Sequence, residues 1–160
     1  MNKLFIAIVL MIAISCNSEV DYSPREINFN RDICCVCKMG LVDQRYTAQL
    51  INNWGEVIWF DDIGCLAELM EDDEWNQISK DSIKIYIGHC ETGKWLDAEK
   101  TFFRYGDTTP MGFGYGALDR AHDSTYTYKE TIKRIHEGKS LVDEFLKKME
   151  DKRKEQENQN

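Results

Sequence analysis

The 160-residue sequence predicts an α+β fold made of two small, related β-β-α-type halves followed by a C-terminal helix. Three observations support this prediction. Short runs of alternating or branched residues come in pairs separated by turns, an amphipathic helical pattern follows the first pair directly, and a longer helical pattern begins at Lys129. Roughly 145 residues remain after removal of a leader, which is enough for a domain with a buried core.

The folded, metal-binding domain is expected over residues 33–146, and its first half over residues 33–80. The predicted elements of this half are strands at 45–51 and 56–60 and a helix at 63–70. A turn at residues 52–55 joins the two strands into a hairpin. Asp61 and Asp62 directly precede the helix, where a short acidic side chain can accept a hydrogen bond from the first turn.

The second half is expected over residues 81–128. Its predicted strands are at 83–87, 95–98 and 102–105, with a fourth near the end of 111–118. The glycine-rich start of that last segment favours a loop that leads into a strand. The C-terminal helix is expected over residues 129–146 with a break at Gly138, and the charged residues 147–160 are expected to fray.

Residues 1–15 have the pattern of a bacterial signal peptide. A positive start is followed by an apolar run of eleven residues from Leu4 to Ile14. This run is shorter than the ~20 residues that a membrane-spanning helix needs. Residues 13–16 resemble a lipobox, so Cys16 is expected to carry the lipid and residues 16–32 to form a lipidated tether. The alternative is an ordinary secretory signal that leaves Cys16 as a free thiol.

These features predict a bacterial membrane lipoprotein that faces the periplasm, with the inner and outer membrane both open as its location. The full chain carries a net charge of −8, and loss of the leader removes Lys3 and makes the charge more negative. A negative chain of this kind argues against nucleic acid as a partner and against an anionic lipid surface. The membrane is therefore expected to be reached through the lipid anchor.

The six cysteines are the strongest functional signal. With Cys16 assigned to the lipid, an odd number remains, and these cannot all pair within the chain. Thiols that stay unpaired in an oxidising compartment usually serve metal binding or redox chemistry. A disulfide between Cys34 and Cys37 is the structural alternative, whereas adjacent Cys34 and Cys35 would bridge only with strain.

The run Cys-Cys-Val-Cys-Lys-Met-Gly at residues 34–40 points to copper. Cu(I) is soft, accepts few ligands and prefers thiolate and thioether sulfur, so Cys37 and Met39 on one flexible loop can face the same ion. Cys34 is a plausible additional donor. Thioethers stay neutral at every pH and cannot form disulfides, which suits an oxidising compartment.

Other cysteines and histidines are weaker candidates. Cys65 lies in the first turn of the expected helix and is interpreted as a small buried hydrophobic residue. His89 and Cys90 could form a second metal site, but an exposed hairpin tip is the preferred interpretation. His122 is expected at the surface, with a place among the copper ligands as a remote alternative.

Five segments in this order resemble the NosL family of lipoproteins, which are copper chaperones serving nitrous oxide reductase. The segments are Cys34–Gly40, Arg45–Leu50, Trp59–Leu66, Trp95–Ala98 and Pro110–Gly112. The resemblance implies an architecture related to the organomercurial lyases and a Cu(I) site formed by Cys37, Met39 and Met111. Lys38 stands where the family usually has glycine, and Cys35 stands where it often has proline.

The resemblance also implies a function: a membrane-anchored Cu(I) chaperone, not an enzyme, that serves nitrous oxide reductase together with an ABC-type membrane assembly. Two alternatives remain open. An organomercurial-lyase-like enzyme would need Cys65, another thiol and either Asp61 or Asp62 to converge. A structural-zinc lipoprotein would need four ligands, such as Cys34, Cys37, Cys65 and Cys90.

Overall fold

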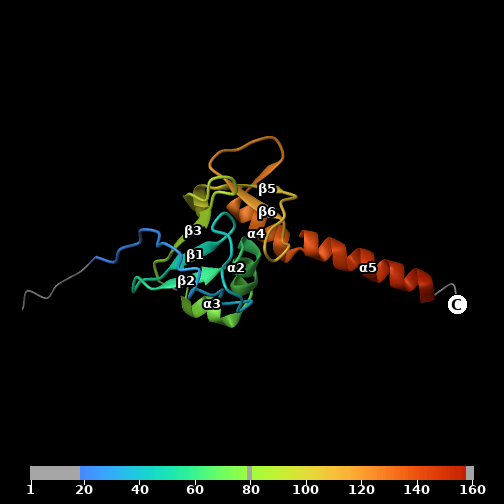
Figure 1. Cartoon of the computed structure of the whole chain (residues 1–160), viewed down its shortest axis with the longest axis horizontal. Helices are drawn as coiled ribbons and strands as arrows, with labels where there is room; N and C mark the ends of the chain where they lie inside the picture. Colours follow the sequence, from blue (N-terminus) through green and yellow to red (C-terminus); the bar gives the residue numbers. More distant parts are fainter. Residues whose placement is uncertain (1–18, 79–80, 158–160) are drawn as a thin grey trace, which may run out of the picture.

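The computed structural model describes residues 19–78 and 81–157. The expected signal peptide at residues 1–15 and the expected lipid-bearing Cys16 lie outside this part of the chain. Within the described residues, none of the helices combines the length and the apolar character needed to span a membrane. Two small antiparallel sheets and several helices make up the molecule (Figure 1), which confirms the predicted α+β class.

Four strands form the first sheet, in the order β2-β1-β3-β4. They are β1 (Ala48–Ile51), β2 (Val57–Phe60), β3 (Lys84–Gly88) and β4 (Trp95–Asp97). The predicted hairpin is confirmed, with Leu50 directly opposite Ile58. Strand β1 is buried along its whole length because it pairs with β2 on one side and with β3 on the other.

Helix α2 (Ile63–Met70) begins and ends where the sequence predicts. Asp62 is its N-cap, and the carboxylate Oδ1 accepts a hydrogen bond from the backbone N–H of Gly64 at 2.7 Å. Most of the helix is buried in the core, including Leu66 and Leu69. The short helix α3 (Asp73–Ile78) follows.

Three strands form the second sheet, in the order β6-β5-β7. They are β5 (Phe102–Tyr105), β6 (Tyr115–Leu118) and β7 (Thr125–Thr127), with the 3₁₀ helix η1 (Ala98–Lys100) before β5. Helix α4 (Tyr128–His136) follows β7. It begins with a capping box, in which the side chains of Thr127 and Glu130 each accept a hydrogen bond from the other residue's backbone N–H.

The division between the two halves differs from the prediction. Strands β3 and β4 lie in the stretch 81–128 assigned to the second half, yet they complete the first sheet. The reason is that β1 keeps a free edge after pairing with β2, and β3 satisfies the hydrogen-bonding groups along that edge. The sheets therefore divide the chain near residue 101 instead of residue 80.

The two sheets meet just after β3. A parallel bridge pairs His89 with Ala117 of β6, and the backbone N–H of Cys90 donates to the carbonyl oxygen of Ala117 at 2.9 Å. Helix α2 packs against β2 and α4, and α4 also packs against β5 and β7. His136 Nε2 lies 2.8 Å from the carbonyl oxygen of Ala67, so the two helices are also linked by a polar contact.

The C-terminal helix extends farther than predicted. The expected break occurs at Gly138, which has a φ of 68°, and the chain resumes in α5 (Leu141–Glu157). This helix projects away from the sheets (Figure 1). Residues 147–157 are helical although we expected fraying, and ion pairs one turn apart, such as Glu150 with Lys154 at 2.7 Å, favour the helix.

The folded body also starts earlier than the predicted Ile33. The buried Gln49 side chain of β1 accepts a hydrogen bond from the backbone N–H of Arg25 at 2.8 Å and donates to the Arg25 carbonyl at 3.0 Å. Asp32 is also buried and accepts a hydrogen bond from the Asn28 N–H at 2.8 Å. Because a buried amide needs partners, the second part of the predicted tether packs onto the first sheet.

Candidate metal centre

The cysteine run forms a tight loop ahead of β1. An antiparallel bridge pairs Ile33 with Gly40, and the N–H of Cys34 donates to the carbonyl oxygen of Met39 at 2.9 Å. This register places Cys34 and Met39 opposite each other across the base of the loop. The turn inside the loop is closed by the N–H of Lys38, which donates to the Cys34 carbonyl at 3.1 Å.

The loop is attached to the outer strand of the first sheet. The backbone N–H of Cys35 donates to the carbonyl oxygen of Trp59 in β2 at 2.8 Å. Strand β2 then leads through Asp61 and Asp62 into α2, whose first turn carries Cys65. The attachment to β2 thus brings the cysteine loop to the N-terminal end of α2.

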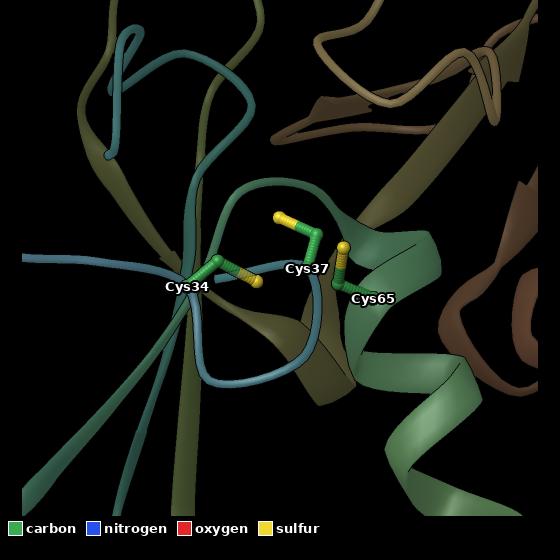
Figure 2. Close-up of side chains that lie close together, drawn as sticks. All are labelled: Cys34, Cys37 and Cys65. Atoms are coloured by element: carbon green, nitrogen blue, oxygen red, sulfur yellow. The ribbon is translucent and has the colours of Figure 1, made fainter. Parts of the chain in front are cut away.

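Three thiols converge at this point. The Sγ atoms of Cys34, Cys37 and Cys65 all lie within 4.8 Å of one another. Figure 2 shows Cys34 and Cys37 approaching from the loop and Cys65 from the helix. All three thiols are free. Cys34 and Cys65 are buried, whereas Cys37 is only half-buried, so the solvent reaches the cluster at Cys37.

Cys34 is the thiol best prepared to exist as a thiolate. The hydrogen bond from the Cys65 thiol, supported by the backbone N–H groups of Asp61, Cys37 and Val36, lowers the pKa of Cys34 to about 5 although burial opposes this change. The thiolate is the form of cysteine that binds metal ions. The backbone around Cys34 is therefore arranged for a negatively charged sulfur atom.

The neighbouring thiols have raised pKa values. The pKa of Cys65 is raised because its proton is held in the hydrogen bond to Cys34 and because the side chain is buried. Burial also raises the pKa of Cys37 and raises that of Cys35 to about 12. In the absence of a metal ion, the cluster therefore holds one negative charge, and a soft cation would displace the remaining protons.

A buried carboxylate lies beside this charged sulfur. Asp61 is 2% exposed, and among the described residues its Oδ1 has no hydrogen-bond partner. Burial, with a smaller effect from the charge on Cys34, raises the pKa of Asp61 to about 6. Two neighbouring acidic groups in a buried place are costly unless a cation compensates them, so the local electrostatics fit a bound metal ion.

The loop that contains Met111 is held at the same end of α2. Thr109 Oγ1 donates to Asp62 Oδ2 at 2.7 Å and accepts a hydrogen bond from the Gly114 N–H at 3.1 Å. The backbone N–H of Met111 also interacts with the Asp62 carboxylate. Asp62 therefore connects this loop to the first turn of the helix, and the sulfur of Met111 stays a predicted ligand.

Gly64 makes this close contact possible. A Cβ atom at Gly64 would fall 2.0 Å from the ring of Phe113, which follows Met111 and Gly112 in the loop. The absence of a side chain thus lets the loop pack directly on α2, next to Cys65. Met39 lies on the other loop and is 47% exposed, which leaves its thioether accessible beside the half-buried Cys37.

The interpretation of His89 and Cys90 as an exposed hairpin tip is wrong. Their exposed fractions are 9% and 3%, because pairing with Ala117 buries them where the two sheets meet. Cys90 is not part of the three-thiol cluster, so the described residues do not form the four-cysteine zinc site considered above. His122 is exposed and, with His89, lines a separate polar cavity of about 430 Å³.

Cys65 is the residue of the cluster that the sequence-based prediction missed. The sequence indicates a small buried hydrophobic residue at this position, and Cys65 is indeed fully buried. A signal was present in the sequence, because Cys65 follows the N-cap Asp62 and lies in the first turn of a helix, where the helix dipole favours thiolates. Its distance of some thirty residues from the cysteine run concealed their proximity.

Together, the two-sheet α+β fold and the preorganised thiol cluster define a class of small proteins suited to binding a soft metal ion. The chain matches no protein-family model and no curated protein sequence. Among solved structures it is similar to the crystal structure of the copper chaperone NosL from Shewanella denitrificans, with a TM-score of 0.57 and 16% sequence identity. The similarity covers 69% of this chain and 96% of that one, and it confirms the expected NosL-like fold.

Proposed function

We propose that this protein is a membrane-anchored Cu(I) chaperone. It binds one copper ion through Cys34, Cys37 and Cys65, with Met39 and Met111 as neutral donors that can be exchanged during transfer. The observation that carries this proposal is the convergence of three thiols, one of them prepared as a thiolate, at the end of α2. The similarity to a solved copper chaperone supports the same assignment.

The arrangement of the thiols suits the transfer of copper as well as its binding. Two of the three sulfur atoms are buried and protect the ion, whereas the half-buried Cys37 and the exposed Met39 leave one side open. Cu(I) accepts few ligands, so a ligand from the receiving protein can enter on the open side before the donor's ligands leave. A site in which buried ligands enclose the ion on every side would not permit this exchange.

Titration of the reduced, metal-free protein with Cu(I), in competition with a chromophoric chelator, tests the site. We expect one tightly bound Cu(I) per chain, loss of tight binding in Cys37→Ser, and weaker binding in Cys65→Ser. Cys90→Ser is the matched control, because this thiol is also buried but lies outside the cluster. A bound zinc ion in place of copper, or equal affinity in all three variants, would contradict the proposal.

The two methionines are tested by the same titration. Met39→Leu and Met111→Leu preserve volume and remove only the sulfur atom, so each should weaken Cu(I) binding without unfolding the protein. Met70→Leu is the control, because Met70 packs against the core from α2 and lies in neither loop. If Met111→Leu retained full affinity and an unchanged transfer rate, the two-loop site would be wrong.

The recipient that we propose is nitrous oxide reductase, whose catalytic copper centre would receive the ion through an ABC-type membrane assembly. This part of the proposal is supported by the resemblance of the sequence segments to the NosL family. Deletion of the gene under copper limitation should leave the reductase without this centre. Full occupancy in the deletion strain would exclude this recipient.

One observation favours a second candidate function. The enzyme alternative requires Cys65, another thiol and a carboxylate to converge, and the carboxyl group of Asp61, although outside the three-thiol cluster, is close enough to Cys34 to feel its charge. A protonated carboxyl group next to two thiols could supply the proton that cleaves a carbon–mercury bond, releasing the hydrocarbon and leaving Hg(II) on sulfur. Incubation of the protein with an organomercurial, followed by detection of the released hydrocarbon, tests this enzyme function. If no hydrocarbon forms, the enzyme function is excluded and the chaperone function is the one that stands.

A further inference from the structure

We propose that Cys34 and Cys37 form a reversible disulfide, and that an external protein dithiol must reduce it before the site can accept metal. The inference that the disulfide controls metal loading rests on the proposed function. The inference that the disulfide forms does not depend on that function. The geometry carries the proposal. Cys34 and Cys37 are three residues apart in a turn closed by the Lys38 N–H, and their sulfur atoms lie within 4.8 Å of each other.

Two of the possible pairs in the cluster include the accessible Cys37, and of these only Cys34–Cys37 lies within a single loop. Cys34 and Cys65 are both fully buried, so neither can be reached by another protein's thiol. Cys37 is half-buried and faces solvent at the open side of the cluster. An external disulfide or thiol must therefore react first at Cys37, and Cys34 is the buried partner on the same loop.

The oxidation step is an ordinary thiol–disulfide exchange. The Cys37 thiolate attacks an external protein disulfide, which forms a mixed disulfide and releases one external thiolate. The Cys34 thiolate then attacks Cys37 Sγ, so that the Cys34–Cys37 bond forms and the second external thiolate leaves. Two protons and two electrons pass from the two cysteines to the external pair, and Cys65 remains a thiol.

Reduction of the Cys34–Cys37 disulfide also begins at the accessible Cys37. An external dithiol attacks the accessible Cys37 sulfur, and the Cys34 sulfur leaves as a thiolate. The Cys65 thiol, whose sulfur atom lies within 4.8 Å of Cys34 Sγ, is placed to donate its proton toward that sulfur as it leaves. The departing charge is therefore stabilised where it develops, which favours a disulfide that external thiols can reduce.

Peptide mapping of the metal-free protein after incubation with glutathione disulfide tests the bond itself. Trypsin cuts after Arg31 and Lys38, so Cys34, Cys35 and Cys37 fall in one peptide, and Cys35→Ser removes the ambiguity. We expect this variant's peptide to lose two hydrogen atoms, with Cys65 still alkylatable and the bond reopened by thioredoxin. Cross-linking of this peptide to the one containing Cys65, or glutathione retained on Cys37, would overturn the proposal.

Cu(I) titration of the oxidised and reduced Cys35→Ser protein then tests the effect on loading. The oxidised form should bind Cu(I) at least a hundredfold more weakly, and reduction should restore binding. Equal binding by both forms would overturn the inferred control of loading even if the disulfide is present. If neither form binds Cu(I), the proposed function fails, and the peptide map alone still decides the disulfide. Cys90→Ser, which leaves all three cluster thiols in place, should behave as the wild type.

Discussion

Lys38 in the cysteine loop has a backbone conformation that is unfavourable for a residue with a side chain. Its φ of 63° lies in the left-handed region, which costs a side-chain-bearing residue roughly 1 kcal/mol relative to glycine. Its ammonium group donates to the carbonyl oxygen of Cys35, which offsets part of this cost. Glycine adopts this conformation without a steric cost.

Lys38→Gly should therefore raise the free energy of unfolding of the reduced, metal-free protein by about 0.5–1 kcal/mol. Urea denaturation measures this change. Lys38→Ala is the control, because it keeps the strained conformation and loses the hydrogen bond to Cys35, and it should be less stable than the wild type. Equal stability of the glycine and alanine variants would contradict the explanation.

Asp61 makes a pH-dependent contribution to stability. Its pKa is raised from an unfolded value near 3.8 to about 6, so the folded state holds the proton more tightly. The protonated group favours folding below about pH 4, and this contribution is lost as the pH rises through about 6. Asp61→Asn should remove a loss of roughly 3 kcal/mol over this range, measured by denaturation at several pH values. An unchanged pH profile in the variant would show that Asp61 titrates normally.

The loop at residues 109–114 is held against the N-terminal end of α2, and this contact between two elements positions Met111 near the thiol cluster. Thr109→Val keeps the shape of the side chain but leaves the buried Asp62 oxygen without its 2.7 Å hydrogen bond. We expect a loss of about 1–3 kcal/mol in unfolding free energy and weaker Cu(I) binding, because the Met111 loop loosens.

Thr131 in α4 provides the matched control for this change. It is fully buried, and among the described residues its Oγ1 has no hydrogen-bond partner. Thr131→Val should therefore be neutral or slightly stabilising, with unchanged Cu(I) affinity. Similar losses for both variants would mean that the Thr109 hydroxyl does not hold the loop.

At the scale of the whole molecule, attachment to the membrane is a prediction from the leader. The apolar run ends on a small residue followed directly by Cys16, as in lipoproteins. Cys16→Ala should release the protein into the soluble fraction, as measured by cell fractionation and immunoblotting. Cys35→Ser is the control and should stay with the membrane. Retention of the Cys16 variant in the membrane fraction would contradict lipid anchoring.

The sequence alone determined the local elements of this protein. Alternating and branched residues located the hairpin of β1 and β2, and helical spacing behind Asp62 located α2 at its observed ends. These features depend on interactions between residues close in the chain, which periodicity and capping express directly. The position of Cys34 and Cys37 on one loop, three residues apart, is of the same local kind.

Only the tertiary structure decided which sheet β3 joins and which third thiol completes the cluster. β3 pairs with the free edge of β1, and Cys65 reaches Cys34 because the Cys35 N–H bonds to Trp59 of β2. Such contacts join residues far apart in the chain, and they form because buried backbone groups must find partners. No local sequence pattern shows which partner a buried backbone group will find. The sequence therefore identified the loop that carries Cys34 and Cys37. The packing of that loop on β2 and α2 added Cys65 and completed the three-thiol cluster.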